Sequence, residues 1–214
     1  MFILSMQISW HGQYTVKIIS KEVTLVLDPY SSSVGLPPFR AKGDVVGLSN
    51  PSDSTMSQIS GIQGNPLIID TPGEYSVKGL TLYAMGWKPA EGEERNVQRW
   101  VIEDMVVLHV GALTRKLEEK ELQELERTDI DVLLIPVGGG SGLTAKDALS
   151  LVGTLEPRVV IPIHYKLPGL TEQLDDVKVF AEEMGVDAKN TEKKLVLKKS
   201  KLPQEDVLTA ILTI

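Results

Sequence analysis

Few side chains in this sequence are able to do acid–base or metal chemistry near neutral pH. The chain has 214 residues, with three histidines and no cysteine. A neutral imidazole binds metals or accepts a proton, whereas a chain without thiols has no cysteine nucleophile, disulfide or thiolate-bound metal. His164 directly follows Arg158–Ile163, an apolar run that is typical of a buried strand. It is therefore the first candidate for a catalytic or metal-binding side chain.

A polar loop after another expected strand supplies the second group of candidates. Ser52 and Asp53, together with His164, would provide the groups of a Ser-His-Asp hydrolase, in which the histidine takes the serine proton. No G-x-S-x-G turn supports this arrangement. Serine and aspartate in a loop more commonly cap a following helix, here expected to begin near Met56. We favour the helix cap and keep all three residues as catalytic candidates.

The other polar positions favour structural roles. His109 ends a buried run and is interpreted as a hydrogen-bonded core or edge histidine, and His11 is given no chemistry. Asp28 is expected to accept hydrogen bonds from nearby backbone or serines. Gly138–Gly142 follows a strand and lacks Gly-Lys-Ser/Thr, so we interpret it as a tight turn. The alternative is an anion at the helix N-terminus near Thr144.

The pattern of apolar residues predicts the elements that must position these groups. The first half reads as strands, and the second half alternates strands and helices. The expected strands are Met6–Trp10, Tyr14–Ser20, Glu22–Leu27, Asp44–Leu48, Pro66–Ile69, Tyr75–Ala84, Val97–Glu103, Met105–Val110, Val132–Val137, Arg158–Ile163, Leu195–Leu197 and Val207–Ile214. The expected helices are Glu118–Arg127, Ala145–Leu155 and Leu174–Met184. This order predicts two packed sheets with helices outside, in a single domain over residues 1–214.

Several short sequence motifs occur in an order that is typical of a known family. They are Ile8-Ser9-Trp10-His11-Gly12-Gln13, Leu25-Val26-Leu27-Asp28-Pro29-Tyr30, Asp44-Val45-Val46-Gly47-Leu48-Ser49, Asp70-Thr71-Pro72-Gly73-Glu74-Tyr75, Val107-Leu108-His109-Val110-Gly111, Leu134-Ile135-Pro136-Val137-Gly138-Gly139 and Val160-Ile161-Pro162-Ile163-His164-Tyr165. The series resembles the metallo-β-lactamase superfamily, in the branch called Zn-dependent hydrolases of the β-lactamase fold. The resemblance implies an α/β fold, a four-layer αββα sandwich of two mixed sheets with outer helices, and a metal site at one edge.

The resemblance also places the family's metal ligands on this chain. Its His-x-His-x-Asp-His motif, aligned without gaps after Ser49, falls on Asn50, Ser52, Ser54 and Thr55. A shift of one residue makes Asp53 the motif's Asp, but Ser49, Pro51 and Ser54 then stand at histidine positions. The next ligand positions fall near Lys88 and on Ala112, and His164 alone stands where the family keeps a metal-binding histidine. Amide and hydroxyl oxygens are poor zinc ligands, so no metal is expected and His164 is a vestigial position.

The composition of the chain argues against two classes of binding partner, nucleic acids and membranes. The net charge is −7, without the basic face that binding a phosphate backbone requires, so no nucleic acid is expected. No apolar run approaches the ~20 residues of a membrane span, so no membrane is expected either. The segment Met1–Ser5 is too short and uncharged for a signal peptide, and Met6 is an alternative start. The absence of cysteine fits the reducing cytoplasm, and we expect a cytoplasmic protein. We also expect a monomer or a homodimer.

These observations predict a catalytically degenerate protein of the metallo-β-lactamase fold. We expect no cofactor, and a binding or structural role toward an unknown protein or small-molecule partner. The alternative is a metal-dependent or metal-independent hydrolase of an ester, lactone or phosphodiester, using a residual site around His164. Zinc would be its cofactor if the family's activity survives.

Overall fold

The fold is described from a computed structural model, which describes residues 5–214. The candidate start at Met1 lies outside the described residues, and so do the first four residues of Met1–Ser5, the segment that we judged to form no signal peptide. The candidate start at Met6 coincides with the first residue of strand β1, Met6–Trp10.

Strands dominate the chain, and three α-helices follow in its second half. The other strands are β2 Val16–Ile19, β3 Thr24–Leu27, β4 Ala41–Lys42, β5 Val45–Gly47, β6 Ile62–Gln63, β7 Leu67–Ile69, β8 Gly73–Val77, β9 Leu80–Trp87, β10 Arg95–Ile102, β11 Met105–His109, β12 Val132–Pro136, β13 Val159–Ile163, β14 Thr191–Glu192, β15 Leu195–Leu197, β16 Leu208–Thr209 and β17 Ile211–Leu212. The α-helices are α1 Glu119–Leu125, α2 Ala145–Leu155 and α3 Val177–Glu183, and the 3-10 turns are η1 Ser32–Val34, η2 Ile59–Gly61 and η3 Lys199–Lys201.

Two large sheets lie face to face. One has six strands in the order β15-β1-β2-β3-β5-β7, and the other has seven in the order β16-β13-β12-β11-β10-β9-β8. Each mixes parallel with antiparallel pairs, for example β3 parallel to β5 and β1 antiparallel to β2. Buried residues of both sheets, such as Ile18 and Trp100, belong to one hydrophobic cluster. The sandwich of two mixed sheets that the sequence predicted is confirmed.

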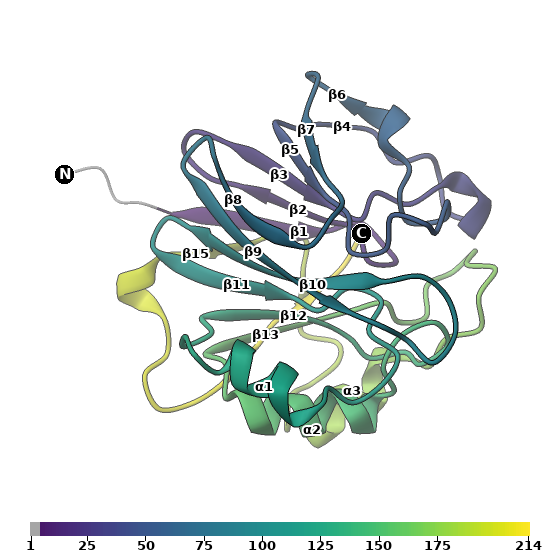
Figure 1. Cartoon of the computed structure of the whole chain (residues 1–214). Helices are drawn as coiled ribbons and strands as arrows, with labels where there is room; N and C mark the ends of the chain where they lie inside the picture. Colours follow the sequence, from purple (N-terminus) through teal and green to yellow (C-terminus); the bar gives the residue numbers. More distant parts are fainter. Residues whose placement is uncertain (1–4) are drawn as a thin grey trace.

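The outer layers differ between the two sheets. Figure 1 shows α1, α2 and α3 against the seven-stranded sheet, on the side away from the six-stranded one. The short β4–β6 pair covers only the part of the six-stranded sheet around β3 and β5, where Ile62 packs on Val26 and Val46. Thr144 caps α2 as predicted, because its hydroxyl accepts the backbone N–H of Asp147 at 3.2 Å.

The strand predicted over Tyr75–Ala84 was wrong, because the chain turns in the middle of it. Lys78 and Gly79 both have positive φ, and Val77 pairs with Leu80 across a two-residue turn. Two consecutive residues of this kind form the type I′ turn that matches the twist of a hairpin. The segment is therefore the β8–β9 hairpin, and Gly79 was the signal for it.

The C-terminal run and the third predicted helix also differ from the expectation in their bounds. Val207–Ile214 forms two short strands, β16 on β13 and β17 on β14, so the run packs on the body of the sandwich as predicted. The helix predicted from Leu174 begins at Val177, because Asp176 accepts the backbone N–H of Lys178 and acts as its N-cap.

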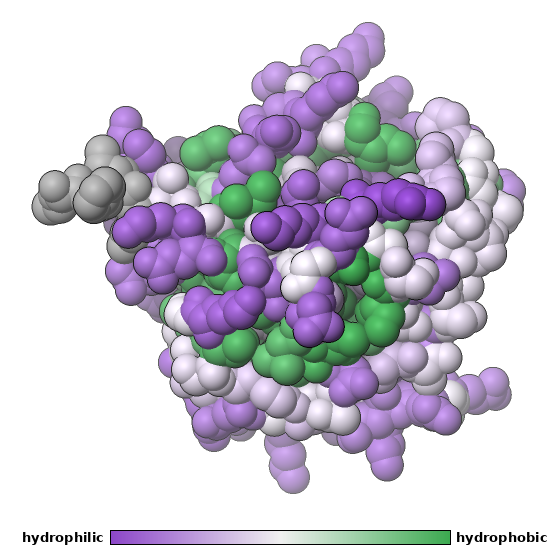
Figure 2. Space-filling model, turned by 90° about the horizontal axis from the view of Figure 1, so that it is seen from above, coloured by the Kyte–Doolittle hydropathy of each residue, from purple (hydrophilic) through white to green (hydrophobic). Residues whose placement is uncertain are grey.

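The surface lacks one continuous apolar face on the side seen from above. Figure 2 shows green hydrophobic patches there that are interrupted by purple hydrophilic side chains. Exposed hydrophobic residues of the chain include Leu67 and Ile68 on β7, an edge strand of the six-stranded sheet. Within residues 5–214, no helix combines the length and hydropathy that crossing a membrane would need.

Candidate functional site

A buried polar cluster anchors the loops that leave the ends of β3, β5 and β11. Asp28 is fully buried, and its two carboxylate oxygens accept the backbone N–H of Ser49 at 2.6 Å and the Ser49 hydroxyl at 2.7 Å. His109 Nε2 lies 2.6 Å from the same carboxylate and is assigned as its donor. The predicted role of Asp28 as an acceptor is confirmed. His109 is a buried hydrogen-bonded histidine as predicted, although the sequence did not indicate that Asp28 was its partner.

This cluster continues between the two sheets through amide side chains. Asn96 donates to the carbonyl of Leu48 at 3.0 Å, and Gln98 donates to the Asn96 side chain at 2.8 Å. Trp100 completes the series with a donation to Gln98 at 3.2 Å. A buried polar network that is largely satisfied in this way holds one arrangement of the loops, because each broken bond would leave an unpaired group in a dry interior.

His164 lies at the end of β13 in a second cluster. Its ring is fully buried and stacks on Tyr14 with ring centroids 4.1 Å apart. Nε2 lies 3.2 Å from the Glu172 carboxylate and 3.4 Å from the Ser141 hydroxyl, whereas Nδ1 is buried without a hydrogen-bond partner. The Ser141 backbone N–H donates to Glu172 at 2.7 Å, which closes the cluster.

The geometry of this cluster differs from that of a nucleophile triad. In a triad the histidine uses one nitrogen for the serine and the other for the carboxylate, which fixes the ring as a base. Here Ser141 and Glu172 share Nε2, and Nδ1 faces the packed backbone near Gly142, where a Cβ atom would come within 3.1 Å of it. The carboxylate therefore competes with the serine for one nitrogen instead of orienting the ring toward it.

The charge of Glu172 depends on these contacts. Desolvation raises the pKa of Glu172, but the hydrogen bonds from His164 and from the Ser141 backbone outweigh it and hold the pKa at about 2. The carboxylate is half-buried and ionised at neutral pH, which leaves a negative charge at the mouth of the cluster.

A pocket of about 250 Å³ opens beside this cluster. Its lining comes from five loops and consists of Gln13, Tyr14, Ser33, Val34, Asp53, Thr55, Met56, Ser141, Thr171 and Glu172. Hydroxyl groups and two carboxylates dominate this lining, and it includes no lysine, arginine or histidine. Its size is close to the lower end of ordinary ligand sites, about 300–1,000 Å³.

The structure separates Ser52 from the other catalytic candidates. The Ser52 hydroxyl donates to the Asn50 side chain at 3.0 Å, and Asp53 accepts both the backbone N–H and the hydroxyl of Thr55. Neither Ser52 nor Asp53 has a hydrogen bond to His164 in the described part of the chain. Asp53 and the Ser141–Glu172 pair line the same pocket. Ser141 and Glu172 were missed as site residues, although Ser141 lies in the glycine-rich segment that the sequence singled out.

The helix expected near Met56 is absent, so its capping interpretation was wrong. Residues 51–56 form turns, and the next regular element is the 3-10 turn η2. Asp53 instead closes a short turn on Thr55, the competing use of an aspartate side chain. The Gly138–Gly142 segment is a tight turn, as predicted, with Gly139 and Gly140 at positive φ.

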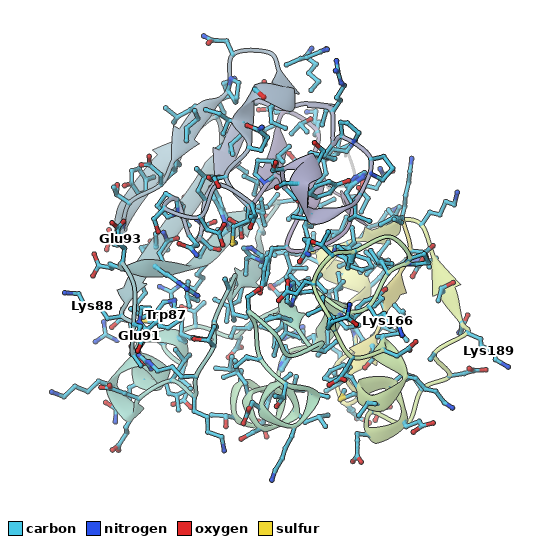
Figure 3. The ribbon with its side chains drawn as sticks, turned by 90° about the vertical axis from the view of Figure 1, so that its right-hand side faces the viewer. Trp87, Lys88, Glu91, Glu93, Lys166 and Lys189 are labelled. Atoms are coloured by element: carbon cyan, nitrogen blue, oxygen red, sulfur yellow. The ribbon has the colours of Figure 1, made fainter. Side chains whose placement is uncertain are left out.

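The remaining ligand positions implied by the resemblance hold no metal-binding side chain. The carbonyl of Ala112 accepts a hydrogen bond from Nη1 of Arg95 at 2.8 Å. The guanidinium of Arg95 lies 5.6 Å from the ring centroid of Trp87. Lys88 is exposed, and in Figure 3 it extends outward at the left edge of the molecule. Lys166 lies apart from it, to the right of the centre of the same view. His11 contacts the Ser9 hydroxyl at 3.0 Å, outside the pocket.

The two-sheet sandwich with its loop-built edge pocket defines a member of the metallo-β-lactamase fold class. A family model described as "Beta-lactamase superfamily domain" matches residues 7–164, so the chain belongs to this superfamily.

Relatives and solved structures agree with that assignment. The UPF0173 metal-dependent hydrolase YtkL of Bacillus subtilis is 23% identical over 84% of this chain and 93% of its own length. A UPF0173 protein of Pyrococcus abyssi is 24% identical over 75% of this chain and 83% of its own. A crystal structure from Thermotoga maritima, described as a candidate Zn-dependent hydrolase of the metallo-β-lactamase superfamily, is 27% identical with a TM-score of 0.77, over 96% of this chain and 98% of its own.

Proposed function

We propose that this chain is a non-catalytic, metal-independent member of the superfamily that binds a small molecule in the edge pocket. The observation that carries the proposal is the identity of the side chains at the family's ligand positions. Among residues 5–214, no three histidine, cysteine, aspartate or glutamate side chains are grouped so that they could hold a metal ion. His164 and Glu172 are two such donors, and hydroxyl groups surround them.

The residues present do not fit a zinc centre. Zinc in proteins takes three or four imidazole, thiolate or carboxylate ligands, and a cation that gains fewer of them stays hydrated. The Asn50, Ser52 and Thr55 side chains already take part in hydrogen bonds of their own loop. Arg95 also places a permanent positive charge against the Ala112 carbonyl, where the resemblance puts a bridging aspartate. That charge would oppose a divalent cation at the same place.

Elemental analysis tests the proposal directly. Protein purified without chelator is expected to carry well below one zinc, iron or manganese per chain, and added zinc is expected to leave its Tm unchanged. A ligand at 100 times its Kd would stabilise the fold by about 2.7 kcal/mol, which a thermal melt resolves easily. The His164→Asn variant is the matched control, and its metal content should equal that of the parent chain. One tightly held metal per chain, lost in that variant, would overturn the proposal.

A residual hydrolase is the second candidate, because relatives such as YtkL are named metal-dependent hydrolases and because His164, Ser141 and Glu172 adjoin the pocket. It predicts turnover of an ester, lactone or phosphodiester that is lost in His164→Asn. Asparagine tolerates the positive φ of 49° at this position, so this variant tests chemistry rather than backbone strain. Activity that survives the change would exclude His164 as its base. In either case we propose a cytoplasmic monomer or homodimer.

A further inference from the structure

The edge pocket contains one polar side chain that the protein leaves without a partner. Gln13 is 4% exposed and lines the pocket, yet its side-chain amide makes no hydrogen bond within the described residues. Its backbone carbonyl is engaged twice, by the indole of Trp10 at 2.8 Å and by the backbone N–H of His164 at 3.1 Å. The Gln13 amide atoms reach the pocket instead of being enclosed in the core, so a hydrogen-bonding group of a ligand there would use their donor and acceptor sites.

The backbone at Gln13 is fixed in one conformation by its hydrogen bonds. Its φ is 48°, in the left-handed region that a residue of this type adopts at a cost. Such a conformation persists where the surroundings over-determine it. The two hydrogen bonds to the Gln13 carbonyl hold that conformation, which keeps the amide at the pocket wall.

The charges of the pocket select the kind of ligand. Glu172 and Asp53 contribute two carboxylates, and the lining contributes no positive side chain. Each Glu172 oxygen is met by one donor, from the Ser141 backbone or from His164, so each retains a lone pair for a further donor. An anionic ligand would meet like charge without any counter-charge, whereas an ammonium group would meet complementary charge.

The other polar side chains at the opening of the pocket are uncharged hydroxyl groups. Ser33, Thr55 and Thr171 are exposed and line the pocket. Their hydroxyl groups already donate hydrogen bonds inside the protein, so their oxygens are left to accept hydrogen bonds from the hydroxyl groups of a ligand. Val34 and Met56 are buried at the pocket wall and provide limited apolar contact. A hydrophobic or aromatic ligand would find little surface to bury here.

We propose that the edge pocket binds a small ammonium-bearing polyol, with its ammonium group between the carboxylates of Glu172 and Asp53 and a hydroxyl group on the amide of Gln13. This assignment deepens the proposed function, on which it rests. It requires neither a metal nor a covalent step.

A matched set of sugars tests the assignment, since the three compounds share a six-carbon frame and differ mainly in charge. Glucosamine, glucose and glucuronate are titrated into the full-length protein, and binding is followed by saturation-transfer NMR and by chemical-shift changes of the pocket amides. We expect glucosamine to bind at least fivefold more tightly than glucose, and glucuronate more weakly than either. Equal binding of glucosamine and glucuronate would overturn the assignment.

Two variants locate the preference. Glu172→Gln keeps a hydrogen-bond acceptor but removes the charge, so the advantage of glucosamine over glucose should shrink at least threefold. Gln13→Asn withdraws the amide while tolerating the left-handed backbone, so it should weaken both sugars. Glu183→Gln removes an exposed carboxylate of α3, away from the pocket, and should change nothing. Circular dichroism and thermal melts identify variants that fail to fold, in which case Asp53→Asn replaces Glu172→Gln.

The outcomes separate this assignment from the function on which it rests. A metal-free protein that binds none of the three sugars, or whose preference survives Glu172→Gln, refutes the ammonium-polyol ligand and leaves the non-catalytic function standing. A protein that holds one zinc per chain refutes the function, whatever the sugars do.

Discussion

The Ser49→Ala variant tests whether the buried Asp28 cluster holds the pocket loops. This change deletes one hydroxyl and keeps the Cβ atom, so its main effect is the loss of the 2.7 Å hydrogen bond to a carboxylate that is fully buried. A hydrogen bond to a charged group contributes about 1.5–3 kcal/mol. Because the backbone N–H of Ser49 and the imidazole of His109 still reach Asp28, the carboxylate keeps two donors and the fold should survive.

The expected loss of unfolding free energy corresponds to a decrease in Tm that is easy to measure. A domain of 150–250 residues loses about 2–4 °C in Tm per kcal/mol, so a loss of about 1.5–3 kcal/mol corresponds to about 3–12 °C. Urea unfolding followed by circular dichroism gives the free energy, and the slope of that free energy against urea should not change. Since residues after Ser49 line the pocket, their backbone amides should also exchange hydrogen faster in the variant.

The Ser52→Ala variant is the matched control. Its hydroxyl also makes one hydrogen bond, to Asn50 at 3.0 Å, but the residue is exposed and the acceptor is neutral. Surface changes of this kind stay within about ±0.5 kcal/mol. If Ser49→Ala proved as mild as Ser52→Ala, the cluster would not be the anchor described above.

Two further predictions concern backbone strain and pH. Gly111→Ala should destabilise the protein by at least about 1–3 kcal/mol, because φ there is 56° and a Cβ atom would lie 2.2 Å from the Ser49 hydroxyl. Gly153→Ala, in α2 with open space around it, should instead stabilise the protein by about 0.5–1 kcal/mol. Chemical unfolding measures the free energy of both variants, and a loss of stability in both would contradict these predictions. Burial, then nearby lysines, lower the pKa of His11 to about 4 from 6.5, so the unfolded chain binds the extra proton and stability should fall as pH drops from 6.5 toward 4. The Tm of His11→Gln should change less with pH than the Tm of the parent between pH 4.5 and 6.5, a range above the titration of Glu172. An identical change of Tm with pH in both proteins would refute this assignment.

The elements with a clear hydrophobic period were predictable. Met6–Trp10, Leu195–Leu197 and Ala145–Leu155 agree with the structure at both ends, because the alternation or the capping residue is local. The β8–β9 hairpin was lost because its two strands read as one apolar run, and the Lys78-Gly79 turn is a weaker signal than Asn-Gly. The helix expected near Met56 failed because an aspartate in a loop serves a cap or a local turn equally well.

The candidate site was predictable in its parts but not in its assembly. His164 was singled out because it ends a buried strand, and Asp28 because it precedes a proline after one. Glu172 had no distinguishing sequence pattern. Its loop turns back so that its carboxylate meets His164 and Ser141, and the distance between residues 141 and 172 along the chain gives no hint of this contact.

The sequence by itself determined the fold family and the chemical types present at the edge of the sandwich, because strand periodicity, phrase order and side-chain identity are all properties of the linear chain. Only the tertiary structure decided how those groups are used. It paired Asp28 with His109, gave both Ser141 and Glu172 to one nitrogen of His164, and left the amide of Gln13 facing a pocket. These outcomes depend on how loops far apart in sequence approach one another, and that is set by the packing of two sheets rather than by any local preference.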